Sequence, residues 1–188
     1  TPVKSKSVAF AASRACEKEA VGVIHAIPIE RIGEMDASVG EQMTKLFHVG
    51  IALPMEQFFR FAINFEECTE DQFSELAPFA FESLRFALDP GEQVGRFNQK
   101  FKKIRDVIVA HLSAINDEFV SMLEEGRELA DICTVVESKC GVKISPESPN
   151  TRRDQQKMRE RDVVYRSETV RCEFHSKLTW NHDRIHFS

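Results

Sequence analysis

Glycine and proline are scarce in this chain, with 8 Gly and 7 Pro among 188 residues. An all-β fold needs a tight turn every ten residues or so, and such turns draw on glycine and proline. The shortage therefore argues against an all-β protein. Hydrophobic residues make up 42% of the chain and charged residues 29%, so we expect a folded core and no wholesale disorder.

Tyrosine and tryptophan are nearly missing, with one of each against 15 Phe. Phe has no polar group, so this balance favours core or groove filling over a sugar-binding or base-stacking surface. The five cysteines include no C-x-x-C, which predicts free thiols in a reducing, intracellular protein. No uncharged run approaches the roughly twenty residues of a membrane span, and the N-terminus lacks the apolar block of a signal peptide.

Sequence motifs of catalysis are also missing. The chain contains no P-loop, no G-x-G-x-x-G and no G-x-S-x-G. We therefore predict no catalytic residues, no cofactor and a non-enzymatic function. One alternative concerns Cys172, His175, His182 and His186, whose spacing would suit one helix face and could hold Zn²⁺. Because no H-E-x-x-H pattern is present, exposed helix histidines are the preferred interpretation, and no metal site is predicted.

A seven-residue apolar repeat is the strongest pattern in the chain. Positions 94, 101, 108, 115, 122, 129 and 136 are Val, Phe, Ile, Ile, Met, Leu and Val. Such a repeat is typical of one face of a long helix. It predicts one helix over 92–140, roughly 70 Å long at about 1.5 Å per residue, with Gly141 just after its end. We therefore expect an elongated molecule.

The remaining segments are also predicted to be helical. Residues 1–90 indicate bent, Phe-rich, acidic helices, with apolar residues at helical spacing from Ile32 to Leu53. Thr69 would cap a helix that Asp89-Pro90-Gly91 ends. From 151 to 188 a polar stretch without Pro or Gly predicts a long basic helix. The predicted fold is a single all-α domain over 1–188, an elongated, antiparallel, coiled-coil-like bundle, with a compact helical bundle as the alternative.

Charge is unevenly distributed along the chain. Residues 1–90 hold 8 basic and 14 acidic side chains, whereas residues 142–188 hold 10 and 7. The net charge of −5 argues against a globally basic nucleic-acid binder but leaves room for a local basic surface. Two basic clusters are candidates for binding anionic lipid head groups, although solvated helix faces would look the same. They comprise Arg96, Lys100, Lys102, Lys103 and Arg105, and Arg152, Arg153, Lys157, Arg159 and Arg161.

Apolar residues on the predicted helix faces are candidates for a dimer or partner interface. Phenylalanine at helical spacing is more often ordinary core, and both interpretations stay open here. The candidates are Phe58, Phe61, Phe65, Phe97, Phe101, Ile108 and Ile115.

A long apolar-striped helix, a Pro-containing loop and a further basic helix together resemble the second and third helices of a BAR domain of the sorting-nexin type. Residues 161–188 are similar to the third helix, in which a Tyr, a Glu, an aromatic, a basic residue and a closing Phe recur. In this chain these would be Tyr165, Glu173, Trp180, Arg184 and Phe187. The segment Glu34-Met35-Asp36 resembles a short acidic segment of the first helix. The resemblance implies a crescent-shaped dimer without chemistry that binds curved, anionic membrane.

We therefore expect a cytoplasmic, peripheral membrane protein, a non-enzymatic dimerising helical module that binds or shapes anionic membrane. Its partners would be a second copy or a related chain and anionic lipids, with no nucleic acid. The alternative function is a compact helical adaptor that binds a partner helix through a Phe-rich groove in 55–88.

Overall fold

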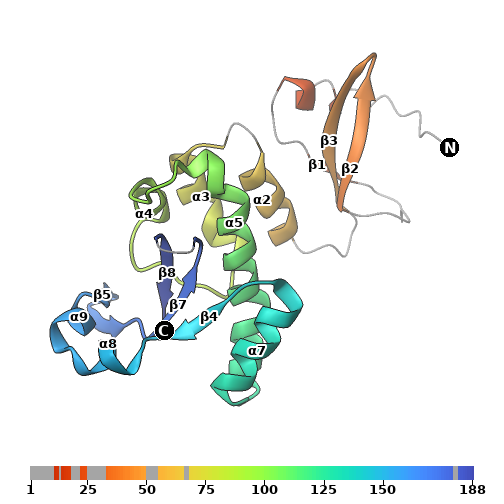
Figure 1. Cartoon of the computed structure of the whole chain (residues 1–188). Helices are drawn as coiled ribbons and strands as arrows, with labels where there is room; N and C mark the ends of the chain where they lie inside the picture. The colour runs from red at the N-terminus through yellow and green to blue at the C-terminus, as the bar shows by residue number, and fades with distance from the viewer. Residues whose placement is uncertain are drawn as a thin grey trace. The chain divides into compact units, whose positions relative to one another are not determined.

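The computed structural model describes residues 11–12, 14–17, 22–24, 33–49, 55–65, 68–179 and 182–188. The chain divides into two compact units, Thr1–Glu82 and Ser83–Ser188. Helices and strands occur in both units (Figure 1), and the strands form three small sheets. The prediction of an all-α, elongated bundle is therefore wrong, because the chain has a mixed α/β fold.

The first unit contains a three-stranded sheet of order β1-β3-β2. Its strands are β1 (Gly22–Ile24), β2 (Gly33–Val39) and β3 (Gln42–Val49), with β1 parallel and β2 antiparallel to β3. Val39 pairs with Gln42, so the hairpin turns through two residues, and Gly40 takes the positive φ of +61° that this turn needs. The helical face predicted from Ile32 to Leu53 is thus a β-hairpin over 33–49; Ile32 and Leu53 themselves lie outside the described residues.

Two helices follow in the first unit, α2 (Met55–Asn64) and α3 (Glu70–Ala80). Thr69 caps α3 as predicted, since its side chain accepts the N–H of Gln72 and the Gln72 side chain accepts the N–H of Thr69. The end of α3 was predicted wrongly. The helix stops at Ala80, and Asp89 instead caps the start of the next helix, because its carboxylate accepts the N–H of Glu92 at 2.8 Å.

The second unit begins with helices and ends in short strands. Its elements are α4 (Pro90–Gly95), α5 (Phe101–Ala114), η1 (Ile115–Phe119), α6 (Val120–Glu124), α7 (Leu129–Cys140), β4 (Ile144–Pro146), α8 (Pro149–Arg153), α9 (Gln155–Arg159), β5 (Asp162–Tyr165), β6 (Glu168–Arg171), β7 (Phe174–Lys177) and β8 (Arg184–Phe187). The segments α5, η1 and α6 run on as one helix of 24 residues, and η1 is a π-helical turn within it. Strands β4, β7 and β8 form one sheet, and β5 and β6 form a separate hairpin.

The seven-residue repeat identified the core face but not the helix boundaries. Positions 94, 101, 108, 115, 122 and 136 are buried, and only Leu129 among the seven is exposed, at 42%. The chain nevertheless leaves the helix at 96–100 and again at 125–128, where Gly126 has a positive φ of +74°. A continuous helix over 92–140 is therefore wrong. Gly141 does follow the end of α7 as predicted, and its conformation is left-handed.

The predicted long basic helix over 151–188 is replaced by two short helices and four strands. The hairpin of β5 and β6 turns through Arg166 and Ser167, which both have positive φ, 49° and 69°. Glycine or asparagine usually marks such a turn, so this sequence gave no turn signal. Because this helix does not form, the predictions of a coiled coil and of a BAR-like fold are wrong. Trp180, one of the residues on which the resemblance was based, lies outside the described residues.

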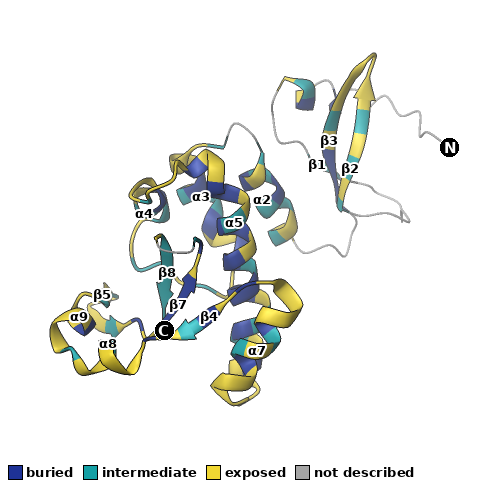
Figure 2. Cartoon of the chain, in the orientation of Figure 1, coloured by how far each residue is buried: buried dark blue, intermediate teal, exposed yellow. Residues whose placement is uncertain are grey.

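One hydrophobic core holds the second unit together. The 24-residue helix contributes Ala114, Ile115, Phe119 and Met122, while α7 contributes Ile132 and Val136. Val142, Ile144 of β4 and Phe174 of β7 complete the buried cluster, with Ile185 and Phe187 of β8 packed against it. Strand β7 is buried along most of its length, and β8 is partly exposed (Figure 2). The sheet β4-β7-β8 is thus anchored by one face.

Candidate functional site

The sheet β4-β7-β8 presents two chemically different faces, because successive side chains of a strand point to opposite sides. Phe174 pairs with Phe187, and both belong to the face that packs on the core. On β7 and β8, His175 pairs with His186 and Lys177 pairs with Arg184. These two pairs are two residues apart along the strands, and each is one residue from the pair of Phe174 with Phe187 or from the equivalent position. All four side chains therefore lie on the face opposite the core.

Glu147 joins these residues from the end of β4. Its backbone N–H donates to the carbonyl of Glu173 at 2.8 Å, which continues the pairing of β4 with β7 by one residue. The alternation of the strand then places Glu147 on the side of His175. We call the set Glu147, His175, Lys177, Arg184 and His186 the polar face.

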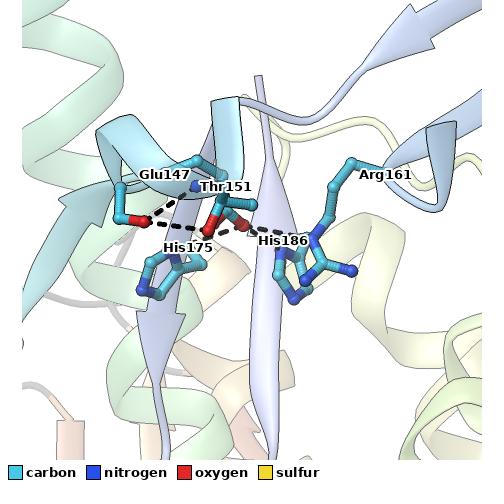
Figure 3. Close-up of polar contacts among 6 residues, drawn as sticks. Glu147, Thr151, Arg161, His175 and His186 are labelled. Carbon is cyan, nitrogen blue, oxygen red and sulfur yellow. Dashed lines mark hydrogen bonds and ion pairs between the residues drawn. The ribbon is translucent and has the colours of Figure 1, made fainter. Parts of the chain in front are cut away.

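The Glu147 carboxylate is the centre of a buried polar cluster. Only 4% of the side chain is exposed. Its Oε1 accepts a hydrogen bond from Nε of Arg161 at 3.1 Å and lies 3.7 Å from Nδ1 of His175 and 3.5 Å from Nδ1 of His186. Figure 3 shows both imidazoles with an edge toward this carboxylate. A buried carboxylate is costly unless it is paired, and Arg161 supplies the opposite charge.

Arg161 is held in place by its backbone. Its N–H donates to the carbonyl of Met158, at the end of α9, and its carbonyl accepts the N–H of Cys172 at 3.0 Å. The residue therefore sits where α9 passes into β5, tied to the chain that follows β6. From there the guanidinium reaches across to Glu147 on the sheet (Figure 3).

Both histidines of the polar face are held in the neutral form. Burial above all lowers the pKa of His186 to about 4; Arg161, His175 and Arg184 contribute to this lowering, and Glu147 opposes it. Burial also lowers the pKa of His175, where Glu147 again opposes and Arg184, Lys177 and Arg161 add to the lowering. At neutral pH the cluster therefore consists of one carboxylate, one guanidinium and two uncharged imidazoles.

One nitrogen of each imidazole ring is enclosed by the protein. Within the described part of the chain, Nδ1 of His175 and Nδ1 of His186 are buried without a hydrogen-bond partner. A proton on each Nδ1 would point at the Glu147 carboxylate and leave each Nε2 as a free base. Among the described residues, no group of three or more His, Cys, Asp or Glu side chains is arranged to hold a metal ion.

A second polar pair lies on the other side of the sheet. Nδ1 of His111, on α5, is 2.6 Å from the hydroxyl of Ser176, and both side chains are buried. Burial lowers the pKa of His111. Since Ser176 has no exposed surface, this pair ties the long helix to β7 and is not open to a substrate.

The two predicted basic clusters occupy different parts of the second unit. Arg96, Lys100, Lys102 and Lys103 are exposed around the start of α5, but Arg105 is buried on the same helix. Arg152, Arg153, Lys157 and Arg159 are exposed on α8 and α9, and Arg161 is half-buried against Glu147. Of the ten predicted cations, only Arg161 belongs to the cluster beside the sheet.

The predicted interface residues are mostly internal. Phe61, Phe101, Ile108 and Ile115 are buried, while Phe58, Phe65 and Phe97 are partly exposed. In the first unit, Phe47 of β3 packs against Phe58 and Phe61 with ring centroids 5.8 and 5.4 Å apart. These phenylalanines therefore act as core within their own unit, and dimerisation through them stays a prediction.

The histidines near the C-terminus are grouped differently in the structure than their sequence spacing predicts. Cys172, His175, His182 and His186 do not share a helix face, because the chain here is a β-hairpin. His182 is exposed in the connecting loop, and His175 meets His186 across the strands. Glu147 and Lys177 were missed altogether. The alternation His-x-Lys followed by Arg-x-His, with period two, is the signal that could have revealed the polar face.

No protein-family model matches the chain, and neither a curated protein nor a solved structure shows significant similarity to it. None of the helices in the described ranges is long and apolar enough to cross a membrane. The interpretation of the polar face therefore depends on its own chemistry.

Proposed function

We propose that the second unit, residues 83–188, binds a phosphate-bearing anion on its polar face. The observation that carries this proposal is the pairing of Lys177 with Arg184 next to His175 and His186 across β7 and β8. Among the described residues, no carboxylate lies within ion-pairing distance of Lys177 or Arg184. In the part of the chain that the structure describes, two cations without an acidic partner thus lie beside two neutral imidazoles.

A phosphate group matches these side chains chemically. Guanidinium and ammonium groups form charge-assisted hydrogen bonds with phosphate oxygens, which are about twice as strong as neutral ones. Glu147 would repel an anion, but its charge is offset by Arg161 at 3.1 Å and it is almost fully covered. The polar face therefore has an excess of positive charge directed at solvent.

Titration calorimetry with inorganic pyrophosphate tests this proposal on the full chain. We expect binding that weakens as the salt concentration rises. The double substitution Lys177→Ala/Arg184→Ala should weaken it by at least about 10-fold, because each charge-assisted contact contributes about 1.5–3 kcal/mol. Arg127→Ala is the matched control, since it removes one exposed cation from the loop between α6 and α7. Absence of binding, or equal weakening by the control, would refute the proposal.

An anionic membrane surface is a second candidate ligand, at a different place. It is favoured by the exposure of four cations on α8 and α9, Arg152, Arg153, Lys157 and Arg159. Each such cation near an anionic membrane contributes on the order of 1 kcal/mol. Co-sedimentation with phosphatidylserine vesicles at two salt concentrations tests it. Binding should be lost when all four are changed to Ala, and a lack of binding at low salt would exclude this candidate.

A further inference from the structure

We propose that His175 and His186 are a general acid–base pair that cleaves RNA by transesterification on the polar face. This proposal rests on the phosphate binding proposed above and adds a substrate class and a reaction to it. Its basis is that one carboxylate faces Nδ1 of both rings, at 3.7 and 3.5 Å. A single group thereby orients two proton carriers on one surface.

The two imidazoles are close enough to act on one phosphodiester. Their ring centroids are 5.8 Å apart with the planes inclined by 44°, as cross-strand partners on β7 and β8. Among the described residues, Nδ1 but not Nε2 of each ring is a buried atom without a hydrogen-bond partner, and the side chains are 8% exposed for His175 and 27% for His186. Lys177 and Arg184, next along the same face, stand where they would offset negative charge on a bound phosphate.

RNA is the substrate that fits two imidazoles and a cationic pair, because it carries its own nucleophile. Nε2 of His186 accepts the proton of a ribose 2′-hydroxyl, and the 2′-oxygen forms a bond to the adjacent phosphorus. The bond from phosphorus to the 5′-oxygen breaks, and that oxygen takes the proton from Nε2 of protonated His175. The products are a 2′,3′-cyclic phosphate and a 5′-hydroxyl. Proton exchange with water restores both histidines.

Burial and the surrounding charges together set the pH at which His175 and His186 have the protonation states that the reaction needs. The reaction needs neutral His186 together with protonated His175. Burial lowers the pKa of both rings, and Lys177, Arg184 and Arg161 act in the same direction on His175, against Glu147. The required state is therefore most populated on the acidic side of pH 6.5. Glu147 is a positioning residue, because it orients both imidazoles without touching the substrate.

The test uses the full chain and an end-labelled oligoribonucleotide in buffer with EDTA, beside the all-deoxy oligonucleotide of the same sequence. We expect cleavage of RNA alone, with cyclic phosphate ends identified by mass spectrometry. His175→Gln and His186→Gln should each lower the rate by about 100-fold or more. His182→Gln, an exposed histidine in the β7–β8 loop, is the matched control and should leave the rate unchanged. Circular dichroism shows whether each variant is folded.

Glu147→Gln separates positioning from mere folding. It should lower the rate and move the optimum of the pH–rate profile further to the acidic side, whereas a purely structural defect would lower the rate equally at every pH. Equal cleavage by wild type and both histidine variants, or cleavage of DNA as well, would overturn the proposal. Pyrophosphate binding together with intact RNA would refute the reaction and leave the binding function standing. Loss of both would refute the two proposals together.

Discussion

Acid should destabilise the second unit through His186, and the structure gives the size of the effect. The ordinary pKa of histidine is 6.5, and burial in the folded chain lowers that of His186 to about 4. Between these pH values the unfolded chain binds more protons than the folded one, so the free energy of unfolding falls as the pH falls. The full stability is present above pH 6.5 and is lost progressively toward about pH 4. The difference in pKa corresponds to about 3 kcal/mol.

The other two buried histidines change the size of the total loss of stability in acid but not its sign. The pKa values of His175 and His111 are also lowered by burial, so both histidines add to the loss of stability in acid. Comparing wild type with His186→Gln cancels most of their contribution, because both are present in the two proteins; the mutual repulsion of charged His175 and His186 stays in the difference. The difference between the two free energies of unfolding should therefore change by about 3 kcal/mol between pH 7 and pH 4.

Urea unfolding followed by circular dichroism at pH 4, 5, 6 and 7 measures this difference. Nuclear magnetic resonance titration of the His186 ring gives its pKa in the folded protein directly. His182→Gln serves as the control, because that ring is exposed, and its pH dependence should match wild type. The reasoning fails if His186→Gln has the same pH dependence as wild type, or if the ring titrates near pH 6.5.

Two further predictions concern the fold of the second unit, both measured as the free energy of unfolding in urea. Phe119→Ala should lower the free energy of unfolding by about 3–5 kcal/mol, because this buried ring packs edge-on against Phe174 and Phe187, with ring centroids 5.5 and 5.2 Å apart. Val164→Ala is the exposed control. A loss for Phe119→Ala no larger than that of the control would contradict the assignment of this core. Ser167→Gly should stabilise the unit by up to about 1 kcal/mol, because the positive φ of 69° strains any residue with a Cβ atom. Destabilisation by this glycine would show that the turn is not left-handed.

Short-range physical chemistry made several features predictable. The N-cap at Thr69 and the helix end at Gly141 depend on a few neighbouring residues, and both were predicted correctly. All five cysteines are free, as their number and spacing indicated. The apolar repeat marked positions that are buried in the folded chain, such as Phe101, Ile108 and Ile115.

The sequence by itself thus determined many of the buried apolar positions and where two local caps form, since both follow from nearby residues and from hydrophobicity. Only the tertiary structure decided between helix and strand over 33–49 and 162–187, because short apolar runs suit either and strand pairing depends on distant partners. The same pairing created the polar face. Glu147, His175 and His186 meet because β4, β7 and β8 align, and a long-range register of this kind has no signature in the spacing of one helix.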